Sequence, residues 1–332
     1  MSNPLRLTLA CNLYDRSQPI LAGQVRIEGC EINYVPLQPE EAHMRAFNGA
    51  DFDITEMSMS SHLIATAAGG SPYLGLPAFV SRAFRHSSLY VRTDRGIRSA
   101  ADLRGKIVGV PEYQMTAAIW VRGFLSSEFG VKSEAVKWRT GGVNAPGRKE
   151  RMELALPEGF DVAPIGESVA LSDALAAGQI DALLSVRTPA CFARHDANVA
   201  RLFPDYAVAE HDYFKRTGIF PIMHCIGVRR DLIERYPWLA RSVYKAFLEA
   251  KTIALDRFRE MGSLAVSHPW LAVEAERLAG LMGQDFWPYG VEPNRTTLTA
   301  LIQYAREQGL IGRDVAIEEL LYAGVSDKPF AF

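Results

Sequence analysis

Arginine residues in loops and at the end of a predicted strand are candidates for binding a carboxylate. The guanidinium group is planar and binds a carboxylate through two parallel hydrogen bonds, which are stronger than bonds between neutral groups. Four arginines have suitable positions: Arg82 and Arg85 in one polar loop, Arg148 after a glycine-rich loop, and Arg187 at a strand end. For each, the alternative is a surface arginine without a ligand. Arg187 and Arg82 are the preferred candidates.

Three further residues are candidates for proton transfer. His86 lies in the same polar loop as Arg82, and His224 follows two apolar residues in a predicted strand. Glu112 is the rival acid, because a carboxyl group near bound anions has its pKa raised toward neutrality. The alternatives are core histidines with satisfied hydrogen bonds, and a Glu112 that is exposed or neutralised by an arginine.

The stretch from Lys106 to Leu125 has the pattern of a buried strand followed by a buried helix. Pro111 ends the strand, and the helix is predicted to begin around Tyr113 or Gln114. In open α/β sheets, ligands lie beyond the carboxyl ends of the strands, where the N–H groups of a helix's first turn favour an anion. The alternative is a strand–helix unit that binds nothing. We expect ligand contacts from Tyr113, Gln114, Met115, Thr116 and the nearby Gly142.

Glu56 and Ser58 complete the candidate binding residues. Ser58, with Ser60 and Ser61, follows a third predicted strand, and a helix-capping role for Ser58 is compatible with ligand contact. Glu56, His62, His86 and His224 are the residues that could converge on a metal, but no HxH or HExxH spacing supports this. We therefore predict no cofactor, and a divalent metal ion is the alternative that stays open. The sequence also lacks a GxSxG elbow, a phosphate-binding loop and GxGxxG, which argues against nucleophilic serine catalysis and nucleotide binding.

Composition favours a globular protein with a small-molecule partner. The 332 residues are 48% hydrophobic and 22% charged, and the 36 basic and 38 acidic residues give a net charge of −2. A net charge near zero gives no overall electrostatic attraction to nucleic acid, and the sequence has no cluster of basic residues that would bind an anionic membrane. Homo-oligomerisation stays open.

The four cysteines are widely spaced and are predicted to be reduced thiols. The N-terminal segment MSNPLRLTLAC contains a short apolar run that ends in Ala10 and Cys11, as in a lipoprotein signal. However, this run is shorter than a normal signal, no basic residues precede it, and Arg6 interrupts it. We expect it to be the first strand, and the protein to be cytoplasmic.

Alternating strands and helices predict two α/β lobes. Strands are expected at Leu5–Ala10, Ile32–Leu37 and Phe52–Met57, each followed by a helix, and a return strand at Ile222–Val228. The first lobe is expected to comprise residues 1–92 and 222–332, and the second residues 93–221. Crossing segments are expected near 88–94 and 205–222, with extended chain from Arg201 to Arg230 and C-terminal helices on the first lobe. A cleft is expected between the lobes.

Several stretches resemble 4,5-dihydroxyphthalate decarboxylases: FDITEMSMSSHL, SRAFRHSSLYVR, DLRGKIVGVPEYQMTAAIWVRG, GGVNAPGR, TGIFPIMH and VEPNRTTLTALIQYAREQGL. The resemblance covers nearly the whole chain. It implies a two-lobed type II periplasmic-binding-protein-like α/β fold, with the second lobe inserted into the first.

The resemblance also implies a decarboxylase of 4,5-dihydroxyphthalate or a close analogue. Such a reaction protonates the ring carbon that bears the departing carboxylate, without an organic cofactor, while the protein holds the second carboxylate. Two alternatives remain open. One is a non-catalytic binding protein for a small anion, in uptake or sensing, and the other is a different lyase on the same fold, similar to menaquinone-pathway enzymes.

Overall fold

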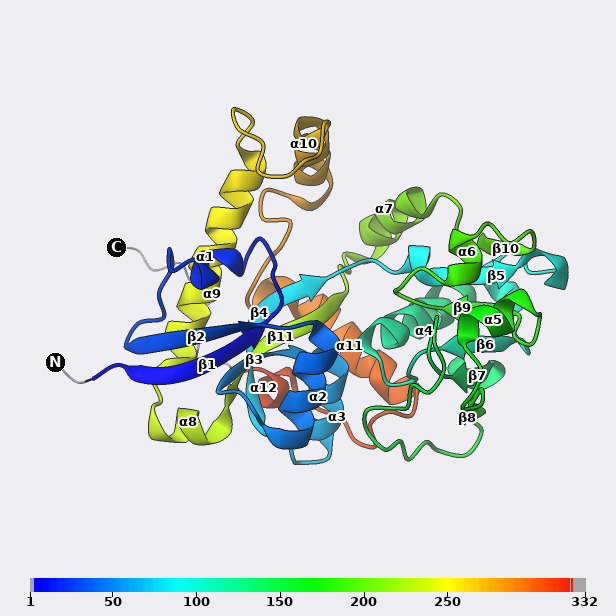
Figure 1. Cartoon of the computed structure of the whole chain (residues 1–332), viewed down its shortest axis with the longest axis horizontal. Helices are drawn as coiled ribbons and strands as arrows, with labels where there is room; N and C mark the ends of the chain where they lie inside the picture. The colour runs from blue at the N-terminus through cyan, green and yellow to red at the C-terminus, as the bar shows by residue number, and fades with distance from the viewer. Residues whose placement is uncertain (1–2, 323, 325–332) are drawn as a thin grey trace. The chain divides into compact units, whose positions relative to one another are not determined.

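A computed structural model describes residues 3–322 and 324, which form two compact units (Figure 1). Within the described residues, unit 1 comprises residues 3–82, 222–298, 315–322 and 324, and unit 2 comprises residues 83–221 and 299–314. This division differs from the expected one in two respects. Unit 2 starts at Ala83 rather than at residue 93, and it also includes residues 299–314.

Unit 1 contains a five-stranded sheet in the order β2-β1-β3-β11-β4. Strand β1 pairs in parallel with β2 and β3, whereas β11 runs antiparallel to β3 and β4. The carboxyl ends of β1, β3 and β4 therefore lie at the same edge of the sheet as the first residues of β11. The strands are β1 (Leu5–Cys11), β2 (Cys30–Pro36), β3 (Ile54–Ser58), β4 (Tyr73–Arg82) and β11 (Ile222–Arg229).

Helices cover the sheet of unit 1, so that all five residues of β3 are buried. Helices α2 and α3 pack on β3, while α9 packs on β4 and α1. Pro39 starts α2 at a position where its missing N–H costs nothing. The helices are α1 (Gln18–Leu21), α2 (Pro39–Gly49), α3 (Met59–Ala67), α8 (Arg230–Arg235), α9 (Leu239–Arg259), α10 (Leu271–Met282), α12 (Ile317–Leu320) and the first residues of α11 (Arg295–Glu307).

Unit 2 contains a six-stranded sheet in the order β10-β5-β9-β6-β7-β8. Gly109 in β6 is required by close packing, because a Cβ there would lie 2.7 Å from the Ile180 side chain. The strands are β5 (Leu89–Arg92), β6 (Ile107–Val110), β7 (Lys137–Thr140), β8 (Val162–Pro164), β9 (Ala182–Leu184) and β10 (Val199–Arg201). The helices are α4 (Thr116–Phe129), α5 (Leu171–Ala176), α6 (Ala190–Ala193) and α7 (Tyr206–Thr217), followed by the remainder of α11.

Two local predictions are wrong. Helix α4 begins at Thr116 rather than at Tyr113 or Gln114, because the preceding Met115 has an extended ψ of 134°. The segment expected to be extended contains the helix α7, whose one buried residue is Tyr213. Its ends instead carry the helical signals, with Asp205 capping the start and Gly218 in the left-handed conformation at the end.

Among the described residues, no helix is both long and apolar enough to cross a membrane. The four cysteines are free thiols, and Cys11, Cys191 and Cys225 are buried.

Candidate functional site

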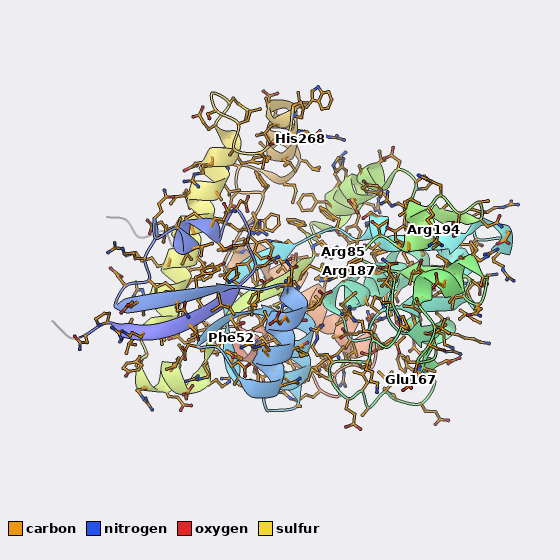
Figure 2. The ribbon with its side chains drawn as sticks, viewed as in Figure 1. Phe52, Arg85, Glu167, Arg187, Arg194 and His268 are labelled. Atoms are coloured by element: carbon orange, nitrogen blue, oxygen red, sulfur yellow. The ribbon has the colours of Figure 1, made fainter. Side chains whose placement is uncertain are left out.

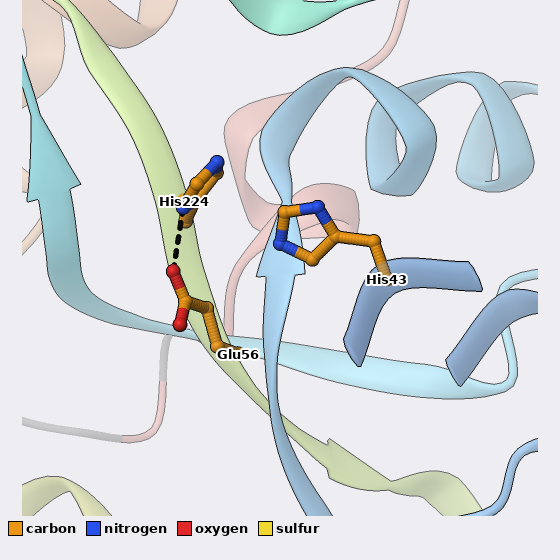
Figure 3. Close-up of side chains that lie close together, drawn as sticks. All are labelled: His43, Glu56 and His224. Atoms are coloured by element: carbon orange, nitrogen blue, oxygen red, sulfur yellow. Dashed lines mark hydrogen bonds and ion pairs between the residues drawn. The ribbon is translucent and has the colours of Figure 1, made fainter. Parts of the chain in front are cut away.

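The centre of the candidate site is Glu56, a fully buried carboxylate near the carboxyl end of β3. The antiparallel register of β11 places His224 opposite Ser58, two residues along β3 from Glu56. His224 Nδ1 lies 2.5 Å from Glu56 Oε1 (Figure 3). Both residues are predicted site residues, and the structure brings them together at the sheet edge where α/β proteins bind ligands.

Each oxygen of Glu56 is contacted by two potential donors. Oε1 accepts from the Tyr14 hydroxyl at 2.6 Å as well as facing His224. Oε2 accepts from the Asn12 backbone N–H at 3.0 Å and from the Cys11 thiol at 3.6 Å. Burial alone raises the pKa of Glu56, but the hydrogen bonds from His224, Tyr14 and Asn12 outweigh it, so the pKa lies below its ordinary value. Glu56 is therefore an ionised carboxylate in a buried position.

The ionised Glu56 determines how His224 can act. A carboxylate accepts hydrogen bonds, so the proton on His224 faces it from Nδ1, and Nε2 is the ring nitrogen left for proton exchange. The His224 side chain keeps 17% of its surface exposed, whereas Glu56 has none. The arrangement is that of a histidine acid–base whose orientation is set by a buried carboxylate.

His43 adds a second imidazole to this site. Its ring, carried by α2, meets the His224 ring edge to face at a centroid distance of 4.5 Å (Figure 3). One ligand atom from each of His43, Glu56 and His224 lies within 4.8 Å of the others. By residue type this set could hold a divalent cation. However, four donors already surround the Glu56 oxygens, and a cation would have to displace some of them.

Sequence reasoning missed the loop between β1 and α1. This loop supplies Asn12 and Tyr14 to Glu56, and its Arg16 lies between the rings of Tyr14 and Trp287. The sequence already predicted that this loop follows the first strand. Because ligands in α/β proteins bind at the loops that follow the carboxyl ends of strands, this position was a signal for a binding role.

The other two predicted residues of unit 1 have structural contacts. Ser58 caps α3, its hydroxyl accepting from the Ser61 N–H. Arg82 is buried, donates to the Asn294 side chain at 2.8 Å, and has its pKa lowered to about 9 by burial. The Arg82–Asn294 bond connects the last residue of β4 to the residue before α11.

In unit 2, a side chain of the same unit binds the backbone N–H groups of the turn before α4. Glu150 accepts hydrogen bonds from the backbone N–H groups of Tyr113 and Gln114, at 2.5 and 3.4 Å. These are N–H groups that were expected to face a ligand. Burial raises the pKa of Glu150 to about 7, with a smaller contribution from Glu112.

The predicted acid Glu112 is paired with arginines. Its Oε1 accepts from Arg148 at 2.9 Å and from Arg151 at 3.3 Å, which is the neutralised alternative considered from the sequence. Arg148 and Glu150 also line a cavity of about 870 Å³ under the loop that connects β7 and β8. Thr116 is buried at the start of α4 and Met115 is partly exposed before it.

His86 lies in an aromatic environment of unit 2. Its ring stacks on Phe124 at a centroid distance of 4.3 Å, and its Nδ1 is 3.9 Å from Glu210. Burial lowers the pKa of His86 to about 4, so the ring is neutral at pH 7.

The three remaining predicted residues are also in unit 2. Arg85 is partly buried and Arg187 is exposed. Both side chains are labelled in Figure 2. Gly142 forms a tight turn in which a Cβ would lie 1.8 Å from the Ala145 carbonyl oxygen. Their roles in binding stay predictions.

Sequence comparison identifies two relatives of the same name. A 4,5-dihydroxyphthalate decarboxylase from Comamonas testosteroni is 43% identical over 318 residues, which is 96% of each chain. A protein of the same name from Pseudomonas putida is 46% identical over 225 residues, or 68% of this chain and 87% of the relative. No family model matches the chain.

Structural comparison identifies periplasmic binding proteins. The aliphatic sulphonate-binding protein SsuA from Escherichia coli aligns with a TM-score of 0.51 at 15% identity, covering 100% of this chain and 96% of that one. SsuA from Xanthomonas axonopodis pv. citri, bound to MOPS, aligns with a TM-score of 0.50 at 14% identity, covering 97% and 99%. These likenesses concern the fold alone, and they confirm the predicted two-lobed α/β fold of the periplasmic-binding-protein type.

Proposed function

Since the chain belongs to the 4,5-dihydroxyphthalate decarboxylase family, as its identity to two such enzymes shows, we propose that it converts 4,5-dihydroxyphthalate to protocatechuate and carbon dioxide. It is then a carboxy-lyase acting on a small aromatic anion.

The reaction replaces a carbon–carbon bond with a carbon–hydrogen bond. The hydroxyl para to the departing carboxylate donates electron density into the ring, and the carbon that bears this carboxylate takes up one proton. The C–C bond then breaks, its electron pair restores the aromatic ring, and neutral carbon dioxide leaves. The protein must supply one proton, hold the hydroxyl and keep the ring oriented.

The observation that carries the proposal is the buried Glu56–His224 pair at the carboxyl edge of the unit 1 sheet. In our proposal, His224 exchanges protons with the substrate through Nε2, while Glu56 holds the orientation of the imidazole. Tyr14 and Asn12 hold Glu56 in turn.

We further propose that the reaction needs no cofactor. Four donors already contact the two Glu56 oxygens, and these bonds favour a proton-transfer role for the carboxylate over metal ligation. A cytoplasmic location is also proposed, supported by the four free thiols. A homo-oligomeric state, and the lack of nucleic-acid and membrane partners, stay predictions.

The test is to incubate the purified chain with 4,5-dihydroxyphthalate in D2O and to identify the products. We expect carbon dioxide and protocatechuate, with one deuteron on the ring carbon ortho to the remaining carboxylate and para to a hydroxyl. Turnover should survive exhaustive chelation and should not rise when divalent cations are added.

Two outcomes contradict the proposal. Tight binding of the substrate without turnover, with and without divalent cations, indicates an anion-binding protein instead. Turnover that is abolished by chelation and restored by one cation shows a metal-dependent enzyme, for which His43, Glu56 and His224 are the candidate ligands.

A further inference from the structure

We propose that Arg16 forms a carboxylate subsite that holds the carboxylate the substrate retains. This inference rests on the proposed function for the identity of the ligand. Arg16 belongs to the same loop as Tyr14, at the carboxyl edge of the unit 1 sheet. It was not among the arginines singled out from the sequence.

The guanidinium of Arg16 is held rigidly. Its carbon Cζ lies 4.0 Å from the centroid of the Trp287 ring and 4.5 Å from that of Tyr14. Nε donates to the Val80 carbonyl oxygen at 2.7 Å, and Nη2 donates to the same oxygen. Trp287 is itself fixed by a 2.8 Å hydrogen bond from Nε1 to the Phe79 carbonyl. A cation held between two aromatic faces loses little freedom when it binds a ligand.

The same guanidinium retains capacity for an anion. Arginine has five N–H donors, and within the described part of the chain three of them have acceptors: two bind the Val80 oxygen and one binds Asp15. Asp15 keeps 58% of its side chain exposed, and an ion pair with an exposed partner contributes little energy. A ligand carboxylate can therefore accept from the remaining donors without loss of a strong internal bond.

Contacts connect Arg16 to the proton-transfer pair. The Tyr14 ring faces Arg16, the Tyr14 hydroxyl donates to Glu56, and Glu56 faces His224. One short loop therefore positions both a fixed cation and the buried carboxylate. Both Arg16 and His224 keep a small exposed part of their side chains, at 13% and 17%.

The chemistry requires such an anchor. The two carboxylates of 4,5-dihydroxyphthalate are equivalent by symmetry, so only the protein can decide which one departs. The departing carboxylate must become neutral carbon dioxide, and a cation bound to it would oppose that change. A cation bound to the other carboxylate fixes the ring without this penalty.

The experiment compares the binding of protocatechuate, which has one carboxylate, with that of catechol, which has none. We expect the wild-type chain to bind protocatechuate more tightly than catechol. Arg16→Gln should weaken protocatechuate binding about 10- to 100-fold, as expected for a lost charge-assisted hydrogen-bond pair, and leave catechol binding unchanged. Arg16→Lys, which keeps the charge but loses the planar fork, should fall between them.

Arg45→Gln is the matched control, because Arg45 also lies over an aromatic ring, that of Phe52, at 4.6 Å. It should leave both affinities unchanged. Equal loss of both ligands in Arg16→Gln would assign Arg16 to the structure of the loop. Unchanged protocatechuate binding, or equal binding of the two ligands by the wild-type chain, would overturn the subsite.

The binding comparison is independent of turnover. If the wild-type chain fails to release carbon dioxide but Arg16→Gln selectively loses protocatechuate, the decarboxylase proposal fails and the subsite stands. If the chain turns over normally and Arg16→Gln leaves both binding and KM intact, the subsite fails and the decarboxylase proposal stands.

Discussion

Glu56 has no contact with solvent, and a buried charge of this kind is tolerated only when it is fully hydrogen-bonded. The donors come from three parts of unit 1: the last residue of β1, the loop after β1 and the strand β11. A carboxylate held from several directions cannot turn, so it keeps one imidazole nitrogen protonated and one orientation of the His224 ring. This geometry suits a proton donor that must reach a particular ring carbon.

Glu56→Gln tests the importance of this charge. Glutamine has nearly the same shape, but its amide NH2 group cannot accept a hydrogen bond, so one of the two donor sets around residue 56 loses its acceptor. We expect kcat to fall about 100- to 10,000-fold, the usual range for impaired acid–base catalysis, with a much smaller change in KM. Steady-state kinetics at several pH values, together with the melting temperature, make the measurement.

Glu31→Gln is the control for this substitution, because Glu31 is an exposed strand carboxylate paired with Arg6. It should leave kcat unchanged. If Glu56→Gln loses less than about tenfold in kcat, or loses only affinity, the pair does not perform the proton transfer.

At the scale of elements, the strands were the most predictable part of the fold. The expected strands at Leu5–Ala10 and Ile222–Val228 correspond to β1 and β11, because runs of apolar residues bounded by polar ones indicate a buried strand. The register between β3 and β11 could not be predicted. Glu56 and His224 are 168 residues apart, and nothing local in either segment specifies that they pair.

The loop after β7 shows a different limit of sequence reasoning. The residues before α4 were expected to bind an anion, and the acceptor present there is the Glu150 carboxyl group of the same unit. A glutamate in a polar loop has no spacing signal that indicates such a contact. The N–H groups of the turn thus bind an internal carboxyl group, and burial disfavours the charged form of that group.

The Glu150 contact predicts a pH-dependent stability. Because the folded-state pKa is raised from 4.5 to about 7, the folded chain binds a proton more readily than the unfolded chain. The contribution of Glu150 to stability is full below about pH 4.5 and is lost as the pH rises through 7. Glu150→Gln removes this titration, so the variant should be more stable than wild type at pH 8, on the order of 1–3 kcal/mol.

Urea unfolding at pH 5 and pH 8 measures the difference. Glu153→Gln in the same loop is the control, since Glu153 is exposed, and its stability should follow that of wild type. A variant Glu150→Gln with the same pH dependence as wild type would show that Glu150 is not the group responsible.

At the scale of the whole molecule, the two-lobed fold was predictable from the sequence. The assignment of residues 299–314 to unit 2 was not. The resemblance implied one lobe inserted into the other, and the two sheets have this connectivity. Residues 299–314 join unit 2 through contacts with α4, which precedes them by more than 150 residues. Tyr304 packs against Trp120 at a centroid distance of 5.8 Å and lies where a side chain at Gly123 would be. Such packing depends on shape between distant segments, which periodicity does not reveal.

Gln308 provides the test of this allocation, because it supports a buried arginine of α4. Its side-chain oxygen accepts from Arg122 Nε at 2.8 Å, and its amide donates to the Ile119 carbonyl at 2.9 Å. Gln308→Ala leaves a buried guanidinium donor without this acceptor, so we expect a loss of about 2–3 kcal/mol in unfolding free energy and faster hydrogen exchange in α4. Gln303→Ala is the control, since Gln303 is exposed on α11 and bonds the exposed Glu307, and it should change stability by less than about 0.5 kcal/mol. If exchange instead accelerates in β1 and β3 while α4 stays protected, the segment stabilises unit 1 and its assignment to unit 2 is incorrect.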